Sequence, residues 1–367
     1  MKLVPQTSPY IRKNVSVARM MGDVIVALIP ITLFAMIYNG WGGIYVILLS
    51  LGVMLFFELL INMFIKWPKD MKIKELFTKE GFSKVKATYT INNFLAPIIS
   101  ALIFALIMPA NSSPYVVICG AAFGIIVGKM LFGGLGQNIF NPAAAGRIFA
   151  TICFGSKIGE ANVSNVDATL GATPLGEVVK NGMNSMIFDL GDLFLGNGIG
   201  GTLGEGCKLL ILVGSIYLFA RRSADLRSAL SYFLSFAVVM LIAVVSFYAR
   251  YETGNIAKMW AYQLLSGGAI FAAVFMITDP VTSPTTKFGR VAFGAIAGCM
   301  TAMIRVIGAY PEGAAFSILL ANMTAPALDY FMRGKPNTYT WKQCLGLGCA
   351  LVVVCCIVSA SVMGGWF

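Results

Sequence analysis

Apolar segments long enough to cross a lipid bilayer recur along the whole chain, from Met21 almost to its C-terminal end. Charged residues make up only 12% of the sequence, whereas a soluble domain typically has about 25%. Inside a bilayer each segment must satisfy its own backbone hydrogen bonds, which favours helices. The sequence therefore predicts an all-α polytopic membrane protein with ten to eleven transmembrane helices. The expected spans are 21–38, 42–65, 91–109, 114–132, 141–155, 207–221, 227–249, 259–278, 291–309, 313–333 and 342–363.

Basic residues set the orientation of these spans, because cytoplasmic connections carry an excess of Lys and Arg. With the N-terminus inside, the inner segments hold 19 of the 27 basic residues and the outer segments hold five. We therefore expect a multi-pass protein of the cell inner membrane with a cytoplasmic N-terminus. Membrane topology also explains the net charge of +11, so we expect the bilayer and not nucleic acid as the partner of these charges.

One connection, from about Phe154 to Gly206, is much longer than the others and is expected on the extracytoplasmic side. Loops of this length usually have a function, which makes it the first place to look for a site. The predicted organisation is a cytoplasmic tail (1–20), a first transmembrane half (21–155), the extracytoplasmic loop (156–206), a second transmembrane half (207–333) and a C-terminal segment with a last helix (334–367).

The chain contains no histidine, which excludes histidine-ligated haem, zinc, copper and non-haem iron. Its eight cysteines form no C-x-x-C pair and fall mostly within apolar segments, where cysteine usually packs as a small hydrophobic residue. We expect no metal site within this chain.

A weak internal repeat relates the two halves. Residues 138–143 (NIFNPA) resemble 322–327 (NMTAPA), and five spans per half would invert the second half relative to the first. A competing alignment pairs 141–147 (NPAAAGR) with 283–290 (SPTTKFGR), and both cannot define the same repeat. Two inverted five-helix repeats are the expected arrangement.

The long loop contains Asp167-Ala-Thr-Leu-Gly-Ala-Thr-Pro-Leu175. One interpretation is local structure, with Thr173 as the N-cap of a helix and Pro174 at its first position. A second uses the same geometry, because a phosphate esterified to that threonine would meet the positive end of the helix. In this interpretation the small residues Gly171 and Ala172 leave the hydroxyl accessible to a modifying enzyme.

The Gly-Ala-Thr core in a large outer loop resembles the flavinylation site of a known family. That family contains the D subunit of the ion-translocating Rnf electron transport complex and the B subunit of the sodium-pumping NADH:quinone oxidoreductase. Residues 8–11 (SPYI), 140–147 (FNPAAAGR) and 278–284 (TDPVTSP) resemble other signatures of the family in the same order. The likeness covers nearly the whole chain, and the short N-terminal tail favours the Rnf member of the family.

The resemblance implies that FMN is attached to Thr173 through a phosphoester, with Gly171 and Ala172 in the same cofactor-binding motif. It also suggests a second, non-covalent flavin such as riboflavin between the halves. The implied partners are other Rnf subunits, among them a second FMN-bearing subunit, and the flavin-transferring enzyme. The NAD site and iron–sulfur clusters are expected on other subunits.

Ionisable groups within membrane spans are costly and often functional, and those in the expected spans include Glu58, Lys129, Arg305 and Asp329. Glu58 and Arg305 lie deep and are expected either to neutralise each other or a partner helix, or to line an ion path. Lys129 and Asp329 lie near helix ends, from which they are expected to extend to the cytoplasmic surface. Glu58 and Asp329 are the ion-path candidates.

Polar residues at proline-broken helix ends face either a polar ligand or their own helix, as caps. They are Asn138, Asn141, Thr278, Asp279, Thr282 and Thr285.

The function expected from the resemblance is electron transfer through covalent FMN in the ferredoxin:NAD+ oxidoreductase complex, coupled to Na+ or H+ transport. This makes the chain one subunit of an enzyme. The alternatives are a channel or secondary transporter for a small polar solute, and a structural scaffold.

Overall fold

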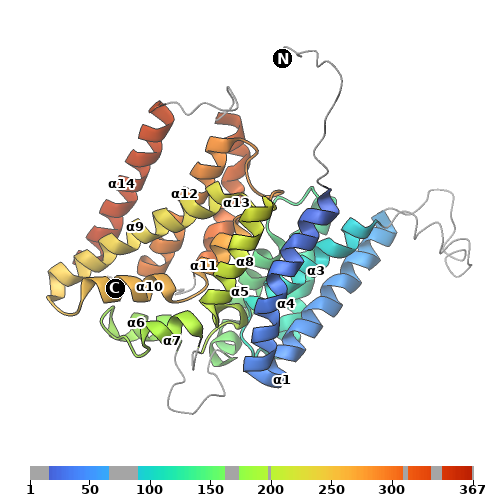
Figure 1. Cartoon of the computed structure of the whole chain (residues 1–367), viewed down its shortest axis with the longest axis horizontal. Coiled ribbons are helices and arrows are strands. Elements are labelled where there is room, and N and C mark those ends of the chain that lie inside the picture. The colour runs from blue at the N-terminus through green and yellow to red at the C-terminus, as the bar shows by residue number, and fades with distance from the viewer. Residues whose placement is uncertain are drawn as a thin grey trace, which may run out of the picture.

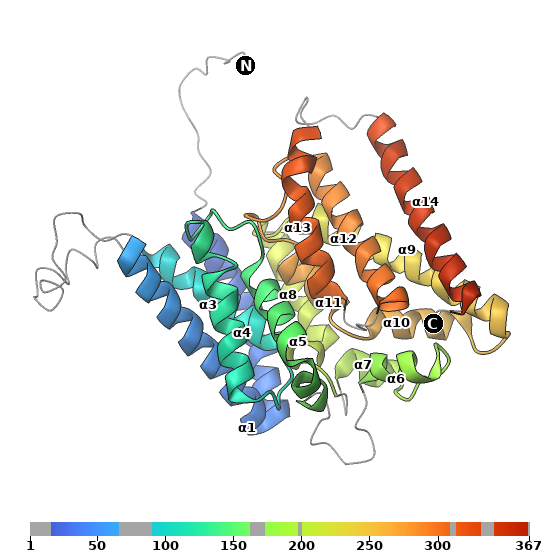
Figure 2. The same ribbon diagram turned by 180° about the vertical axis from the view of Figure 1, so that it is seen from behind.

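Helices provide the regular structure of the residues that the computed structural model describes, which are 16–65, 90–161, 173–196, 200–308, 313–331 and 341–365. In these ranges the bridge between Pro109 and Thr202 is the one β-type pairing. The helices are α1 (Val17–Ile65), α3 (Ile91–Leu106), α4 (Pro114–Ile126), η2 (Met130–Phe132), α5 (Pro142–Ala161), α6 (Pro174–Asn181), α7 (Leu190–Leu195), η3 (Leu203–Glu205), α8 (Lys208–Arg221), α9 (Leu226–Tyr251), α10 (Ile256–Leu265), α11 (Ala269–Phe271), η4 (Ala272–Met276), α12 (Lys287–Ile307), α13 (Ala314–Phe331) and α14 (Trp341–Gly364) (Figures 1 and 2). The all-α prediction is confirmed.

The first element, α1, consists of two arms because the chain turns back at Gly40 (Figure 1). Gly40 has φ 56° and ψ −137°, a conformation that glycine adopts without a Cβ clash. The arms approach closely beyond the turn, where a Cβ on Gly43 would lie 2.8 Å from the Ala35 carbonyl oxygen. The expected spans 21–38 and 42–65 coincide with the two arms.

The other expected spans also fall on helices, but 259–278 is interrupted. Helix α10 and the following segment α11–η4 are bent by 58° at Ser266–Gly268, where Gly267 has φ 72°. Among the described residues, five helices are long and apolar enough to cross a membrane, or six if the bent pair is one span. The chain is therefore a multi-pass membrane protein, and the count of ten to eleven crossings stays a prediction.

Closely packed glycines join helices α9 and α12 in the second half. A Cβ on Gly298 would lie 2.2 Å from the Tyr232 carbonyl oxygen, and one on Gly294 would lie 2.4 Å from that of Ser228. Small residues at helix interfaces let backbones approach in membrane proteins, where dispersion contacts replace the hydrophobic effect as the main attraction. These glycines therefore set the distance between α9 and α12.

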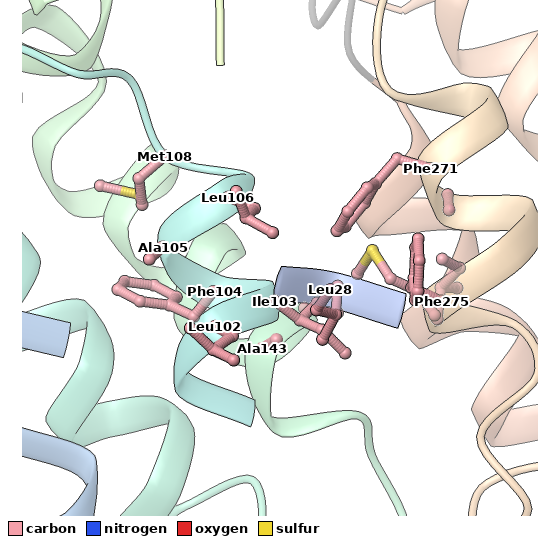
Figure 3. Close-up of a cluster of buried hydrophobic side chains, with 14 of the residues drawn as sticks. Leu28, Leu102, Ile103, Phe104, Ala105, Leu106, Met108, Ala143, Phe271 and Phe275 are labelled. Carbon is pink, nitrogen blue, oxygen red and sulfur yellow. The ribbon is translucent and has the colours of Figure 1, made fainter. Parts of the chain in front are cut away.

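Buried apolar side chains fill the boundary between the N-terminal helices and the segment 269–276 (Figure 3). Leu28 of α1 and Leu106 of α3 are fully buried, and Phe271 and Phe275 approach them from α11 and η4. Each dispersion contact between two atoms is weak, but a densely packed cluster of this size contains many such contacts, and their energies add up. This cluster joins the two halves.

A polar contact joins the same two halves at the first turns of α1. The carboxylate of Asp23 accepts hydrogen bonds from Tyr217 at 3.1 Å, from Arg221 at 2.9 Å and from Ser223 at 2.5 Å. Asp23 is only 5% exposed, so an unpaired carboxylate there would be costly. The three donors from α8 and the turn after it compensate that burial.

Candidate functional site

Thr173 begins helix α6, as the sequence predicts. Its Oγ1 accepts a hydrogen bond from the Gly176 backbone N–H at 3.0 Å, and Pro174 occupies the first helical position. The predicted N-cap is confirmed, and Thr173 is half-buried beside the free N–H groups of the first turn. Gly171 and Ala172 lie outside the described residues.

Helix α6 is fixed to the second half by its apolar side chains. Leu175 and Val178 are 3% and 2% exposed, and Val178 packs in a cluster that includes Tyr262 of α10. A Cβ on Gly267 would lie 2.5 Å from Leu175 Cδ1, so the start of α6 rests on the break after α10. The position of Thr173 therefore depends on the shape of that break.

Arg305 stabilises this break from inside the bundle. Its Nη1 donates to the Gln263 carbonyl at 2.6 Å and its Nη2 to the Ser266 carbonyl at 3.3 Å. Because α10 ends here, these carbonyl oxygens receive no hydrogen bond from the backbone N–H groups of a following helical turn. Arg305 thus acts as a C-terminal cap on a partner helix, and its side chain is 4% exposed.

Thr173 lines a cavity of about 690 Å³ that lies between the two halves. Its walls come from α5, from the turn around η3, from the segment α11–η4 and from the start of α13. The lining residues are Ile107, Arg147, Ile148, Thr151, Ile152, Cys153, Gly155, Ser156, Ile158, Gly159, Thr173, Thr202, Glu205, Gly268, Ala272, Met276, Ala314, Ala315 and Phe316. Its wall combines apolar and polar groups, and its volume lies within the roughly 300–1,000 Å³ that is common for cofactor sites.

The ion-path candidate Glu58 forms a buried ion pair with Lys129, which precedes η2. Lys129 Nζ lies 2.6 Å from Glu58 Oε2 and 2.8 Å from Oε1, and the side chains are 3% and 1% exposed. Of the pairings expected for Glu58, the one with a partner segment is observed, whereas Arg305 donates hydrogen bonds to carbonyls at the end of α10. The expectation that Lys129 extends to the surface is wrong, because this carboxylate holds it inside.

The second ion-path candidate, Asp329, joins α13 to the segment before α12. Its Oδ1 accepts hydrogen bonds from the backbone N–H and the Oγ1 of Thr285, at 2.9 and 3.1 Å. Asp329 therefore has a structural contact of its own. An ion path through Glu58 and Asp329 stays a prediction.

The proline-broken helix ends at Asn141 and Asn322 contact each other, and Asn141 also contacts the end of η4. Asn141 Oδ1 accepts the Ala143 N–H at 3.0 Å, as a cap of α5, and its Nδ2 donates to the Met276 carbonyl at 3.4 Å. The Asn322 side-chain amide is oriented so that its nitrogen donates a hydrogen bond to the Ile318 carbonyl. Its oxygen then accepts a hydrogen bond from the Asn141 backbone N–H at 3.0 Å. Asp279 likewise accepts the Val281 N–H at 3.1 Å. At these positions the cap interpretation holds, and the inverted repeat stays a prediction.

The lack of a side chain at position 176 keeps the Thr173 hydroxyl accessible. A Cβ on Gly176 would lie 2.8 Å from Thr173 Oγ1, closer than real Cβ contacts allow. If Thr173 carries the covalent FMN that the motif predicts, we expect Gly176→Ala to lower this modification several-fold, although alanine favours helix formation. Mass spectrometry of the loop peptide measures this. The matched control is Gly191→Ala in α7, where the nearest atom is an Asp189 carboxylate oxygen at 3.6 Å, and equal loss in both variants would contradict the prediction.

The fold and the cavity define an all-α, multi-pass membrane protein with a hydroxyl-bearing site between its halves. The chain belongs to the family described as NQR2, RnfD, RnfE, which matches residues 4–338. It is 29% identical over 337 residues to the D subunit of the Na(+)-translocating ferredoxin:NAD(+) oxidoreductase complex of Acetobacterium woodii, covering 91% of this chain and 95% of that relative. The family resemblance inferred from the motifs is confirmed.

The B subunit of the Na(+)-translocating NADH-quinone reductase is also similar. The protein of Chromohalobacter salexigens is 37% identical over 238 residues, which cover 64% of this chain. A protein of Pseudomonas aeruginosa is 35% identical over 244 residues, again 64% of this chain. The match spans 57% and 59% of the length of these two relatives.

Sequence reasoning did not assign two charged residues of the cavity, Arg147 and Glu205. Arg147 is the last residue of the motif 140–147, and Glu205 is one of several acidic residues in the long loop. An arginine inside an expected span is costly to bury, and this signal would have singled out Arg147. No comparable signal distinguished Glu205 from its neighbours.

Proposed function

We propose that this chain is the membrane-embedded, flavin-carrying subunit of an ion-translocating ferredoxin:NAD+ oxidoreductase complex of the Rnf type. FMN is bound covalently to Thr173 through a phosphoester, and electron flow through it is coupled to Na+ or H+ transport. One observation carries the proposal: the Thr173 hydroxyl caps a helix and lines a cavity of about 690 Å³ between the halves. The similarity to an Rnf-type relative over 91% of the chain supports it.

The residues present fit a flavin nucleotide. The free N–H groups at the start of α6 suit a phosphate on Thr173, because helix N-termini bind anions. Ile148, Ile152 and Phe316 give the cavity apolar walls, and Arg147 gives it a positive charge. Bound there, the flavin supplies reversible electron transfer. The chain's own residues hold it, exclude water from one side and fix its position relative to the bilayer.

The proposed assembly follows from the family. The chain lies in the cell inner membrane with its N-terminus in the cytoplasm and residues 156–206 outside, as the distribution of basic residues indicates. A second FMN-bearing subunit exchanges electrons with this one, and a flavin-transferring enzyme modifies Thr173. A second, non-covalent flavin such as riboflavin lies between the halves, and NAD binds elsewhere in the complex.

Fluorescence of the denatured protein on a gel tests the proposal. The full chain, produced with its flavin-transferring enzyme, is expected to fluoresce under ultraviolet light, and Thr173→Ala is expected to be dark. The matched control Thr202→Ala removes another hydroxyl of the cavity and should remain fluorescent. A dark wild-type band, with a loop peptide of unmodified mass, would overturn the proposal and favour a channel or secondary transporter.

A further inference from the structure

Two charged side chains line the Thr173 cavity, and Met108 contacts the first of them and the short helix η3 that carries the second. Arg147 on α5 is 7% exposed, and its Nη1 lies 3.7 Å from Met108 Sδ. The turn η3 that ends in Glu205 is fixed where the Leu203 N–H donates to the Met108 carbonyl at 3.0 Å. The two charges therefore have defined places in the cavity wall.

Glu205 is held close to the broken helix on another part of the wall. A Cβ on Gly268 would lie 3.0 Å from Glu205 Oε1, so the carboxylate rests against this backbone. Gly268 itself lines the cavity and directly precedes α11. One guanidinium and one carboxylate thus border the same space, and their electrostatic effects on its contents oppose each other.

We propose that Arg147 and Glu205 set the reduction potential of the flavin held in this cavity, Arg147 raising it and Glu205 lowering it. This inference rests on the proposed function, and it assigns to two positions a role beyond holding the cofactor. Both act as tuning residues through their charge.

The physical reason is the charge that reduction adds. When an oxidised flavin takes two electrons from another flavin and one proton from water, its ring gains one negative charge. Charges at or below a protein surface interact more strongly than charges in bulk water, because the effective dielectric constant there is lower. A buried guanidinium therefore stabilises the reduced form, and a carboxylate destabilises it, as charges near the ring of a bound flavin generally do.

A potentiometric titration of the full chain carrying covalent FMN tests the inference. The flavin absorbance is followed during reduction by dithionite, and the signal of Thr173→Ala is subtracted to remove non-covalent flavin. We expect Arg147→Gln to shift the midpoint potential to more negative values and Glu205→Gln to shift it to more positive values. Arg147→Lys keeps the charge and is expected to stay near the wild-type potential.

The sign of the two shifts separates tuning from damage to the fold, because misfolding would not move the potential in opposite directions. Lys157→Gln is the matched control, since it removes an exposed positive charge from the same helix and should leave the potential unchanged. Shifts of the same sign in Arg147→Gln and Glu205→Gln, or no shift in either, would overturn the inference. A wild-type chain without covalent flavin would instead overturn the proposed function.

Discussion

Replacing Lys129 by Met is expected to destabilise the protein by about 3–5 kcal/mol, because it leaves the carboxylate of Glu58 buried without its ionic partner. The two side chains are 3% and 1% exposed, and their closest oxygen–nitrogen distance is 2.6 Å. Removing one member of a buried pair costs far more than the pair itself contributes. The measurement is the midpoint of thermal unfolding in detergent.

The double variant Glu58→Gln/Lys129→Met distinguishes this cause from a packing defect. It leaves no unpaired charge, so we expect it to recover most of the stability that Lys129→Met loses. The two single variants for comparison are Glu58→Gln and Lys129→Met. If the double variant loses as much stability as these two lose together, charge compensation does not stabilise this site. The comparison needs no assumption about ion transport.

Replacing Gly298 by Ala is expected to destabilise the second half by about 1–3 kcal/mol through overpacking. The new Cβ would lie 2.2 Å from the Tyr232 carbonyl oxygen and 2.1 Å from Ser235 Oγ. Since the Tyr232 carbonyl belongs to the backbone of α9, the two helices must separate. Thermal unfolding and the yield of monodisperse protein both report this loss.

Gly52→Ala in α1 and Gly346→Ala in α14 are the matched controls for this prediction. At both positions no atom outside the local helix backbone lies within 4 Å of the added Cβ, so the substitution costs no packing. Alanine favours a helix over glycine by about 1 kcal/mol, and we expect both controls to be as stable as the wild type or slightly more stable. A loss in the controls equal to that in Gly298→Ala would contradict the packing explanation.

The sequence predicted the helices well, because long apolar segments leave the chain little choice of structure. It also predicted the local geometry of Thr173, since an N-cap threonine followed by proline depends on adjacent residues alone. The break after α10 was missed, although Ser266-Gly267-Gly268 interrupts the apolar pattern there. Its stabilisation by Arg305 depends on a helix about 40 residues further along the chain, which no local pattern reports.

The cavity could not be predicted either, because the residues that line it are far apart in the sequence. Its wall combines α5, η3, the segment α11–η4 and α13, and only packing brings them together. The partner of Glu58 shows the limit most clearly. Lys129 lies 71 residues away, and its position near the end of an expected span suggested an exposed side chain.

The composition of the cavity wall sets an order of events during biogenesis. Thr173 is synthesised well before Ala314, Ala315 and Phe316, which complete the wall from α13. When Thr173 has left the ribosome but α13 has not, the nascent chain has no complete pocket to receive a bulky aromatic ring. The flavin proposed on Thr173 would therefore find its complete pocket only after insertion of α13.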